Sequence, residues 1–263
     1  MRGKWKALVC GMLMLMSSQG FAQDLSRHFV GLDGAFVLLN GRTGETIRHN
    51  AARAAQRFAP CSTFKIPHTA VLLESKTASD PEFLVKYDPA LKQQGAWAQD
   101  HTLRSAYRVS ALWYYLALAR RVGLPTEARL LKQFAYGNES AAGGLDGREG
   151  PFWVDGTLRI SADEQVAFLK RFYEGRLGLS SRTTTLTKDI MLADNTPRWR
   201  LSAKTGACRP AGEDATVWYV GYVERDSNVF YFALELGAKE FGTLLDQRVP
   251  KAKAILADLG ILD

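Results

Sequence analysis

The order of sequence patterns along this chain constrains its fold more than any single motif does. Near the start, residues 35–49 read as a β-hairpin, because apolar residues lead into the turn sequence Asn40-Gly41-Arg42-Thr43-Gly44. Later the hydrophobic period changes to two, which predicts strands at residues 199–206, 216–224 and 229–236. The hairpin and these strands share one antiparallel sheet only if the two ends of the chain meet.

Helices are expected between these strands and at the end of the chain. The sequence Ser161-Ala162-Asp163-Glu164 has the form of a capping box and opens an amphipathic helix to about Tyr173. Residues 76–100 lack periodicity and residues 136–150 are rich in glycine, so both read as loops. Further helical patterns cover residues 62–74, 101–134, 184–192 and 247–259.

These patterns predict an α+β fold in which an antiparallel β-sheet is flanked by helices and carries a mostly helical subdomain. With 46% hydrophobic residues, the chain can bury a substantial core. We expect a single domain over residues 23–263. Its sheet subdomain takes about residues 23–60 and 197–263, and its helical subdomain takes about residues 61–196.

Residues 1–22 are predicted to be a cleaved signal peptide. Arg2, Lys4 and Lys6 precede an apolar run over residues 7–16, and Gly20-Phe21-Ala22 ends in a small residue suited to cleavage. The run is too short for a stable membrane anchor, and no later stretch reaches transmembrane length. We therefore expect an exported protein without a membrane anchor after cleavage, periplasmic if the source is Gram-negative.

Charge and missing motifs exclude several function classes. The formal charge is +7, but the basic residues are scattered and do not interleave with aromatic ones, so nucleic-acid binding has little support. There is no His-Glu-x-x-His, Cys-x-x-Cys, phosphate loop or dinucleotide fingerprint, so we expect no metal and no nucleotide cofactor. All four histidines precede residue 102 and no Gly-x-Ser-x-Gly occurs, which argues against a Ser-His-Asp hydrolase.

The first candidate for chemistry is Ser62-Thr63-Phe64-Lys65, which sets a hydroxyl three residues before an amine. At helical spacing these side chains share a face, and a neutral lysine can take the proton that a serine must lose to become a nucleophile. Neutrality near pH 7 requires burial to lower the lysine pKa by roughly 3 units, or about 4 kcal/mol. The bland alternative is a lysine at a buried helix start.

Two further short motifs follow in the chain. Lys204-Thr205-Gly206 lies near the end of a predicted strand, where a lysine and a hydroxyl can hold a carboxylate and the glycine lets a substrate approach the backbone. Ser110 begins a helical pattern. The alternatives are an ordinary strand end for the first and a helix N-cap for the second.

In their order along the chain, Ser62-x-x-Lys65, then Ser110, then Lys204-Thr205-Gly206, the three motifs resemble those of the serine β-lactamases and penicillin-binding proteins. Class D is the closest class in resemblance, because Leu112 stands where class A enzymes and transpeptidases carry Asn, and because Tyr136-Gly137-Asn138 and Trp153-Val154-Asp155-Gly156 match class D patterns. The likeness extends from about residue 35 to the C-terminus. It implies hydrolysis of a small-molecule β-lactam by a monomer or homodimer.

The resemblance also implies catalytic roles. Ser62 would be acylated by the lactam carbonyl. Lys65 would be carboxylated by CO₂ or bicarbonate, with no other cofactor, and would serve as general base for acylation and deacylation. The indole N–H of Trp153 would anchor the carbamate, and Ser110 would pass a proton toward the lactam nitrogen.

Substrate binding is implied for a second group of residues. Lys204, Thr205 and Arg248 would hold the substrate carboxylate, and the backbone N–H groups of Ser62 and Ala207 would form the oxyanion hole. Gly206 and Leu112 would line the site. Class D enzymes usually have Val in place of Leu112 and often an aromatic residue in place of Ala207, so the cleft is expected to differ at both points.

Cys61 and Cys208 are the two cysteines that remain after signal cleavage. One precedes the nucleophile and the other follows Gly206 by two residues. If the strand that contains Gly206 runs beside the helix start, the two are neighbours, and we expect a disulfide between them in an oxidising compartment. The alternative is two inert buried thiols.

Two rival functions share the same serine chemistry. A D,D-peptidase or transpeptidase is disfavoured by Leu112, and a β-lactam sensor that stays acylated is disfavoured because no membrane segment or signalling domain follows the signal peptide. A class A enzyme is disfavoured because no Glu-x-x-Leu-Asn supplies a separate deacylating base.

Overall fold

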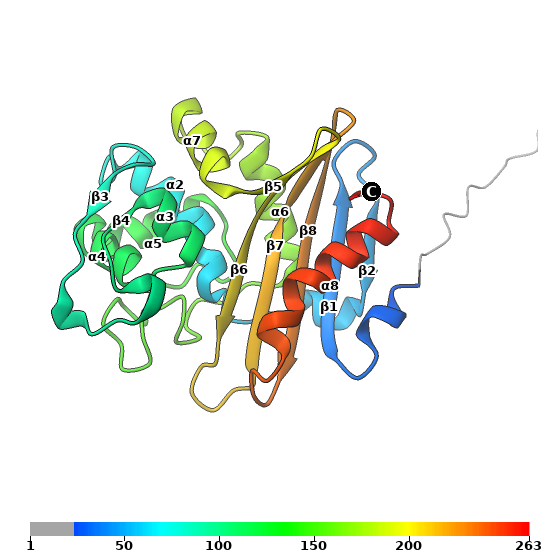
Figure 1. Ribbon diagram of the computed structural model, residues 1–263, viewed down its shortest axis with the longest axis horizontal. Helices are drawn as coiled ribbons and strands as arrows, with labels where there is room; N and C mark the ends of the chain where they lie inside the picture. Colours follow the sequence, from blue (N-terminus) through cyan, green and yellow to red (C-terminus); the bar gives the residue numbers. More distant parts are fainter. Residues whose placement is uncertain (1–23, 263) are drawn as a thin grey trace, which may run out of the picture.

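A six-stranded antiparallel sheet runs through the molecule, in the order β2-β1-β8-β7-β6-β5. The computed structural model describes residues 24–262, so the predicted signal peptide lies outside the described residues. Figure 1 shows β1, from the start of the chain, beside β8 and the C-terminal helix α8. The strands are β1 (Asp33–Asn40), β2 (Thr46–His49), β5 (Leu192–Asn195), β6 (Trp199–Cys208), β7 (Ala215–Arg225) and β8 (Asn228–Ala238). The predicted α+β fold with joined chain ends is confirmed.

Strands β7 and β8 form the long hairpin predicted near the C-terminus. Their register pairs Arg225 with Asn228, so the turn contains only Asp226 and Ser227. Both turn residues have positive φ, 51° and 58°, as a two-residue hairpin turn requires to match the twist of its strands. A separate short pair, β3 (Leu84–Val85) and β4 (His101–Thr102), lies outside the main sheet.

The helices occupy three regions around the sheet. α8 packs on β6, β7 and β8 from one face, and α6 packs on β1, β7 and β8 from the other. Figure 1 shows α2, α3, α4 and α5 gathered beyond the β6 side of the sheet. The α-helices are α1 (Ala51–Ala55), α2 (Lys65–Glu74), α3 (Leu103–Val109), α4 (Leu112–Val122), α5 (Leu124–Gln133), α6 (Ala162–Tyr173), α7 (Ser181–Met191) and α8 (Leu244–Asp258). Short 3₁₀ helices are η1 (Ser26–Phe29), η2 (Cys61–Phe64), η3 (Pro89–Leu91) and η4 (Gly95–Trp97).

Side-chain alternation along the strands separates two cores. Phe36 and Leu38 of β1 belong to the core under α8, whereas their neighbours Ala35 and Val37 belong to the core shared with α6 and the other helices. This alternation follows from the period of two in a strand. In β6 it turns Ala203 toward the α8 core and Lys204 toward α3, where the amine lies 5.5 Å from the ring of Tyr107.

Several predicted helix boundaries need correction, and one capping box is confirmed. The helical pattern over residues 101–134 corresponds to three helices, because Ser110 and Gly123 have φ of 62° and 84° and interrupt the helical path. The capping box of α6 is present, with Ser161 Oγ accepting from the Glu164 N–H at 3.1 Å and the Glu164 carboxylate accepting from the Ser161 N–H at 2.9 Å.

The helix predicted over residues 184–192 ends one residue early, at Met191, and strand β5 was not predicted. Leu192 already belongs to that strand, which is only four residues long and has two exposed residues at the sheet edge. Such a short, half-polar edge strand gives little periodic signal. Helix α8 begins three residues before the predicted start and includes Pro250. Between residues 24 and 262, no helix combines the length and apolar character that a bilayer crossing needs.

Candidate active site

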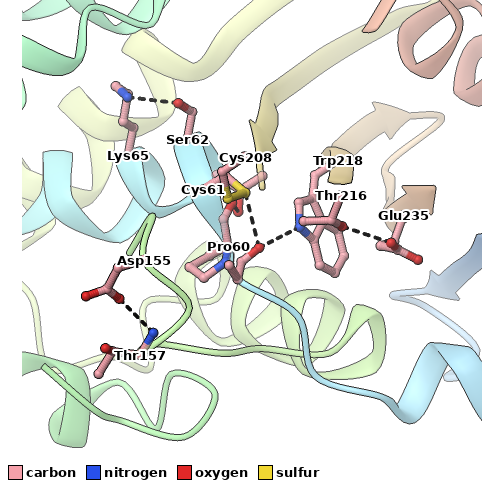
Figure 2. The surroundings of a disulfide bond; sticks show 12 residues. Pro60, Cys61, Ser62, Lys65, Asp155, Thr157, Cys208, Thr216, Trp218 and Glu235 are labelled. Atoms are coloured by element: carbon pink, nitrogen blue, oxygen red, sulfur yellow. Dashed lines mark hydrogen bonds between the residues drawn. A yellow bond between two sulfur atoms is a disulfide. The ribbon is translucent and has the colours of Figure 1, made fainter. Parts of the chain in front are cut away.

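Ser62 and Lys65 face each other where η2 leads into α2. Residues three apart are almost eclipsed in a 3₁₀ helix, so the two side chains lie one above the other. The distance from Lys65 Nζ to Ser62 Oγ is 3.0 Å, a hydrogen bond drawn in Figure 2. The predicted shared face is confirmed, and this contact is the geometry that a serine and its base require.

Lys65 is buried, and its amine has no oppositely charged partner among the described residues. Its side chain is 1% exposed, and its amine lies 5.2 Å from the centre of the Tyr115 ring. Among residues 24–262 no carboxylate pairs with it. Burial lowers the pKa of Lys65 to about 7, so a large fraction of the amine is neutral at neutral pH.

Trp153 lies in the same aromatic packing as the residues that flank Lys65. Its ring stacks on Phe64 with centroids 5.2 Å apart and contacts His68 edge to face at 5.4 Å. The backbone N–H of Cys61 donates to the Trp153 carbonyl at 2.9 Å. The indole N–H has no hydrogen-bond partner among the described residues, so it remains available to an anionic group.

Tyr136, Gly137 and Asn138 support the loop that contains Trp153. The Tyr136 ring packs against Phe64, and Asn138 Oδ1 accepts from the backbone N–H of Arg159 at 2.9 Å. Gly137 has φ of 58°, and a side chain there would come within 2.0 Å of the Arg159 carbonyl oxygen. This Tyr-Gly-Asn sequence therefore has an architectural task.

Ser110 does not have the N-cap position that the sequence left open. It ends α3 in the left-handed conformation, and the N-cap of α4 is Ala111. Its Oγ is buried and has no hydrogen-bond partner among the described residues. A buried hydroxyl without a hydrogen-bond partner costs free energy, unless a bound molecule forms a hydrogen bond with it.

Lys204 and Thr205 lie on the β6 strand, at the edge of the helical part. Lys204 is 4% exposed, and its amine donates to the carbonyl oxygen and the hydroxyl of Thr205 at 3.1 and 3.3 Å. Burial, together with the charges of Lys65 and Arg248, lowers the pKa of Lys204 well below its usual value.

Arg248 reaches the same region from α8. Its Nε and Nη1 atoms are buried without a hydrogen-bond partner among the described residues, and burial lowers the pKa of its guanidinium. Its charge also contributes to the lowered pKa of Lys204. Together with Lys65, these two cations form a site whose electrostatics favour an anion.

Gly206 brings β6 against the turn that carries Ser62. A Cβ at this position would lie 2.9 Å from Thr63 Cγ2 and 3.0 Å from the Pro60 carbonyl oxygen, so the two backbones approach more closely than a side chain permits. Two residues later, Cys208 forms a disulfide with Cys61. The predicted pairing is confirmed.

A cavity of about 480 Å³ opens beside Lys204 and Thr205, between α3, β5, β6 and α8. Its lining includes Tyr107, Tyr219 and Val249, and ionic side chains such as Arg104 and Lys253. The cavity borders the Lys204 end of the site, whereas Ser62 and Lys65 are outside its lining.

Leu112 and four residues that were not predicted from the sequence complete the surroundings. Leu112 is the first residue of α4 and is partly buried against the core. Tyr115 and Tyr107 place rings over the amines of Lys65 and Lys204, and a buried pair joins His68 Nε2 of α2 to Glu127 Oε1 of α5 at 2.9 Å. The described residues contain no group of three His, Cys, Asp or Glu that would suit a metal ion.

Comparison with known sequences gives one consistent family. Residues 34–259 match the family model of the penicillin binding protein transpeptidase domain. The chain is 36% identical over 203 residues to the β-lactamase OXA-48 of Klebsiella pneumoniae, covering 77% of this chain and 75% of that one. It is 33% identical to the β-lactamase OXA-10 of Pseudomonas aeruginosa over 207 residues, covering 78% and 76% of the two chains.

Solved structures agree with the sequence comparison. A class D β-lactamase from Nostoc superposes with a TM-score of 0.84 at 32% identity, over 91% of this chain and 99% of that one. The class D β-lactamase FUS-1 (OXA-85) from Fusobacterium nucleatum subsp. polymorphum gives a TM-score of 0.83 at 28% identity, over 89% and 95% of the chains.

Proposed function

The chain belongs to the class D β-lactamase family, and from this membership we propose that it hydrolyses the amide bond of β-lactam antibiotics through an acyl-enzyme on Ser62. The observation that carries the proposal is the 3.0 Å contact between Ser62 Oγ and the buried amine of Lys65. A serine becomes nucleophilic only when a neighbouring base takes its proton, and Lys65 is the group within reach.

Lys65 serves as that base in its carboxylated form. A neutral amine attacks CO₂, the N–C bond forms, one N–H proton leaves to solvent, and an anionic carbamate results. The residues present fit this group, since burial lowers the Lys65 pKa to about 7, no carboxylate opposes a new negative charge, and the Trp153 indole N–H is unpartnered. The carbamate supplies a base for the Ser62 proton and later for the deacylating water.

The remaining roles concern binding and proton movement. Lys204, Thr205 and Arg248 hold the substrate carboxylate, and the backbone N–H groups of Ser62 and Ala207 stabilise the oxyanion that develops on the lactam carbonyl. The unpartnered Oγ of Ser110 carries a proton to the leaving lactam nitrogen. Gly206 keeps β6 close to the turn that carries Ser62, and Leu112 packs against the core at the start of α4.

Turnover of a chromogenic cephalosporin and of a penicillin, with and without bicarbonate at mildly acidic pH, tests this mechanism. We expect multiple turnovers that bicarbonate increases, because acid favours loss of CO₂ from a carbamate. The Ser62→Ala variant is expected to be inactive. A single stoichiometric burst in both conditions would instead indicate a D,D-peptidase or a sensor that stays acylated.

Resistance is the expected consequence for a cell. Expression of the full chain in a susceptible Gram-negative host should raise the minimal inhibitory concentration of a penicillin, and Ser62→Ala should abolish the increase. Export through residues 1–22 is part of this proposal. Cell fractionation should therefore find the cleaved protein in the periplasm, while a chain lacking these residues should stay inside and give no protection.

A further inference from the structure

The Cys61–Cys208 disulfide joins the two chain segments that approach the nucleophile. Cys61 precedes Ser62 directly, and Cys208 follows Ala207 directly, although 147 residues separate the two cysteines. Their Cα atoms lie 5.5 Å apart, and both side chains are buried. Figure 2 shows the disulfide beside the Ser62–Lys65 pair, between η2 and the end of β6.

The backbone directly before Ser62 does not have a regular helical conformation. Cys61 has φ of 51°, in the left-handed region that residues with a side chain rarely adopt, so its surroundings must hold it there. Within the described residues, its backbone is held by the bond from its N–H to the Trp153 carbonyl, and its side chain by Cys208.

The β6 segment is fixed differently, through the sheet. Cys208 pairs with Thr216 in the ladder between β6 and β7, and Gly206 pairs with Trp218. The indole N–H of Trp218 reaches across to the Ala59 carbonyl at 2.9 Å. The disulfide therefore connects a strained turn to a strand whose position the central sheet determines.

We propose that the Cys61–Cys208 disulfide is a positioning element of the oxyanion hole, which holds the Ser62 N–H and the Ala207 N–H at the separation that the developing oxyanion requires. This inference rests on the proposed function, because it gives both N–H groups that task. Each donor is covalently one residue from a bridged cysteine, so a shift at either cysteine moves a donor. Cys61 and Cys208 touch no substrate and act only through these neighbours.

The test compares the oxidised wild type with Cys61→Ala, Cys208→Ala and the double variant. Acylation by a chromogenic cephalosporin is measured in single turnover, together with KM and with the affinity for a boronic acid that forms a tetrahedral adduct on Ser62. We expect the acylation rate constant and the boronate affinity to fall together by about tenfold to hundredfold. This decrease does not exceed the effect of removing one oxyanion-hole donor completely. The apparent KM should change little.

A destabilised control separates positioning from stability. Leu38→Ala removes a buried side chain of β1 in the core under α8, far from the site in the chain, and should lower Tm while acylation at a permissive temperature stays normal. If the cysteine variants fail to fold, reduction of the folded wild type by dithiothreitol, monitored by circular dichroism, gives the same measurements. Reoxidation should restore activity.

Two results would contradict the inference in different ways. Folded, reduced protein that acylates and binds boronate like the oxidised form, with only a lower Tm, would leave the disulfide a purely structural bond while the proposed function stands. Oxidised wild type that neither acylates nor binds boronate would overturn the proposed function and this inference with it.

Discussion

Two clusters of buried charge in this protein are built in opposite ways. On the sheet, Arg53 bonds both carboxylate oxygens of Glu235, at 2.6 and 2.9 Å, and also reaches Asp33. Thr216 donates a further hydrogen bond to Glu235. In the candidate active site, the cations Lys65, Lys204 and Arg248 come together, and within the described part of the chain none of them makes an ion pair.

The pKa values of the basic residues in the two clusters shift in opposite directions. For Arg53, burial alone would lower the pKa, but the hydrogen bond and charge of Glu235 outweigh it and the pKa is raised. For Lys65 and Lys204 burial goes uncompensated and both pKa values fall. Burial raises the pKa of Glu235 even beside Arg53, so the balanced cluster matters chiefly because loss of one partner would leave the other buried without compensation. The unbalanced cluster has an uncompensated cost, which the proposed substrate carboxylate or carbamate would relieve.

Breaking the balanced cluster should have the largest effect on stability. Glu235→Ala leaves the Arg53 guanidinium mostly buried without its main partner, and removing one member of a buried pair costs about 3 to 5 kcal/mol. We expect Tm to fall by roughly 10 °C, measured by circular dichroism. The matched control is Glu240→Ala, whose exposed pair with Arg209 is worth about 0 to 1 kcal/mol. Equal losses in the two variants would contradict the comparison.

Removing a charge from the unbalanced cluster should instead stabilise the protein. Lys65→Met keeps a long side chain at a fully buried position and removes an amine whose burial is unfavourable. In CO₂-free buffer at pH 6 we expect a gain of about 2 to 4 kcal/mol in the free energy of unfolding, with loss of turnover. Urea denaturation measures the gain.

The pH dependence of that gain has a definite sign. The folded-state pKa of Lys65 is about 7, below its usual value of 10.5, so between these values the unfolded chain binds more protons and wild-type stability rises with pH. The advantage of Lys65→Met is therefore full below pH 7 and disappears toward pH 10. The exposed control Lys132→Met should show no such trend. A destabilised Lys65→Met protein at pH 6 would refute the assignment of an uncompensated charge.

Local spacing explains which parts of the site could be predicted from the sequence. Ser62 and Lys65 are three residues apart, so their contact follows from helical geometry alone. Cys61 and Cys208 needed a further step, since their pairing depends on β6 running beside η2. The cysteine pairing could still be predicted, because the strand pattern and the resemblance put Lys204-Thr205-Gly206 next to the serine.

Other features depend on tertiary structure and left no sequence signal. The left-handed backbone of Ser110 is imposed by the junction of α3 with α4, and no glycine marks it. Tyr115 and Tyr107 read as ordinary apolar helix residues, although their rings lie over the two active-site amines. The buried pair of His68 and Glu127 joins α2 to α5, and neither helix pattern indicates the other.

Arg248 should sharpen the comparison with a smaller effect, because its proposed role is to bind an anion and not to stabilise the fold. Arg248→Gln removes a half-buried charge whose Nε and Nη1 lack partners, so stability should change by no more than about 1 kcal/mol. For a β-lactam with a free carboxylate we expect KM to rise about tenfold, equivalent to about 1.4 kcal/mol, with kcat nearly unchanged. The KM of the methyl ester of the same substrate should rise much less, because the ester offers no charge to the guanidinium.

The control variant is Arg200→Gln. Arg200 is exposed, with its Nε 3.9 Å from Glu224 Oε2, so the substitution should leave the KM values of acid and ester unchanged. If Arg248→Gln raised the KM of acid and ester equally, Arg248 would act through packing and not through its charge. The anion-binding part of the unbalanced cluster would then consist of Lys65 and Lys204 alone.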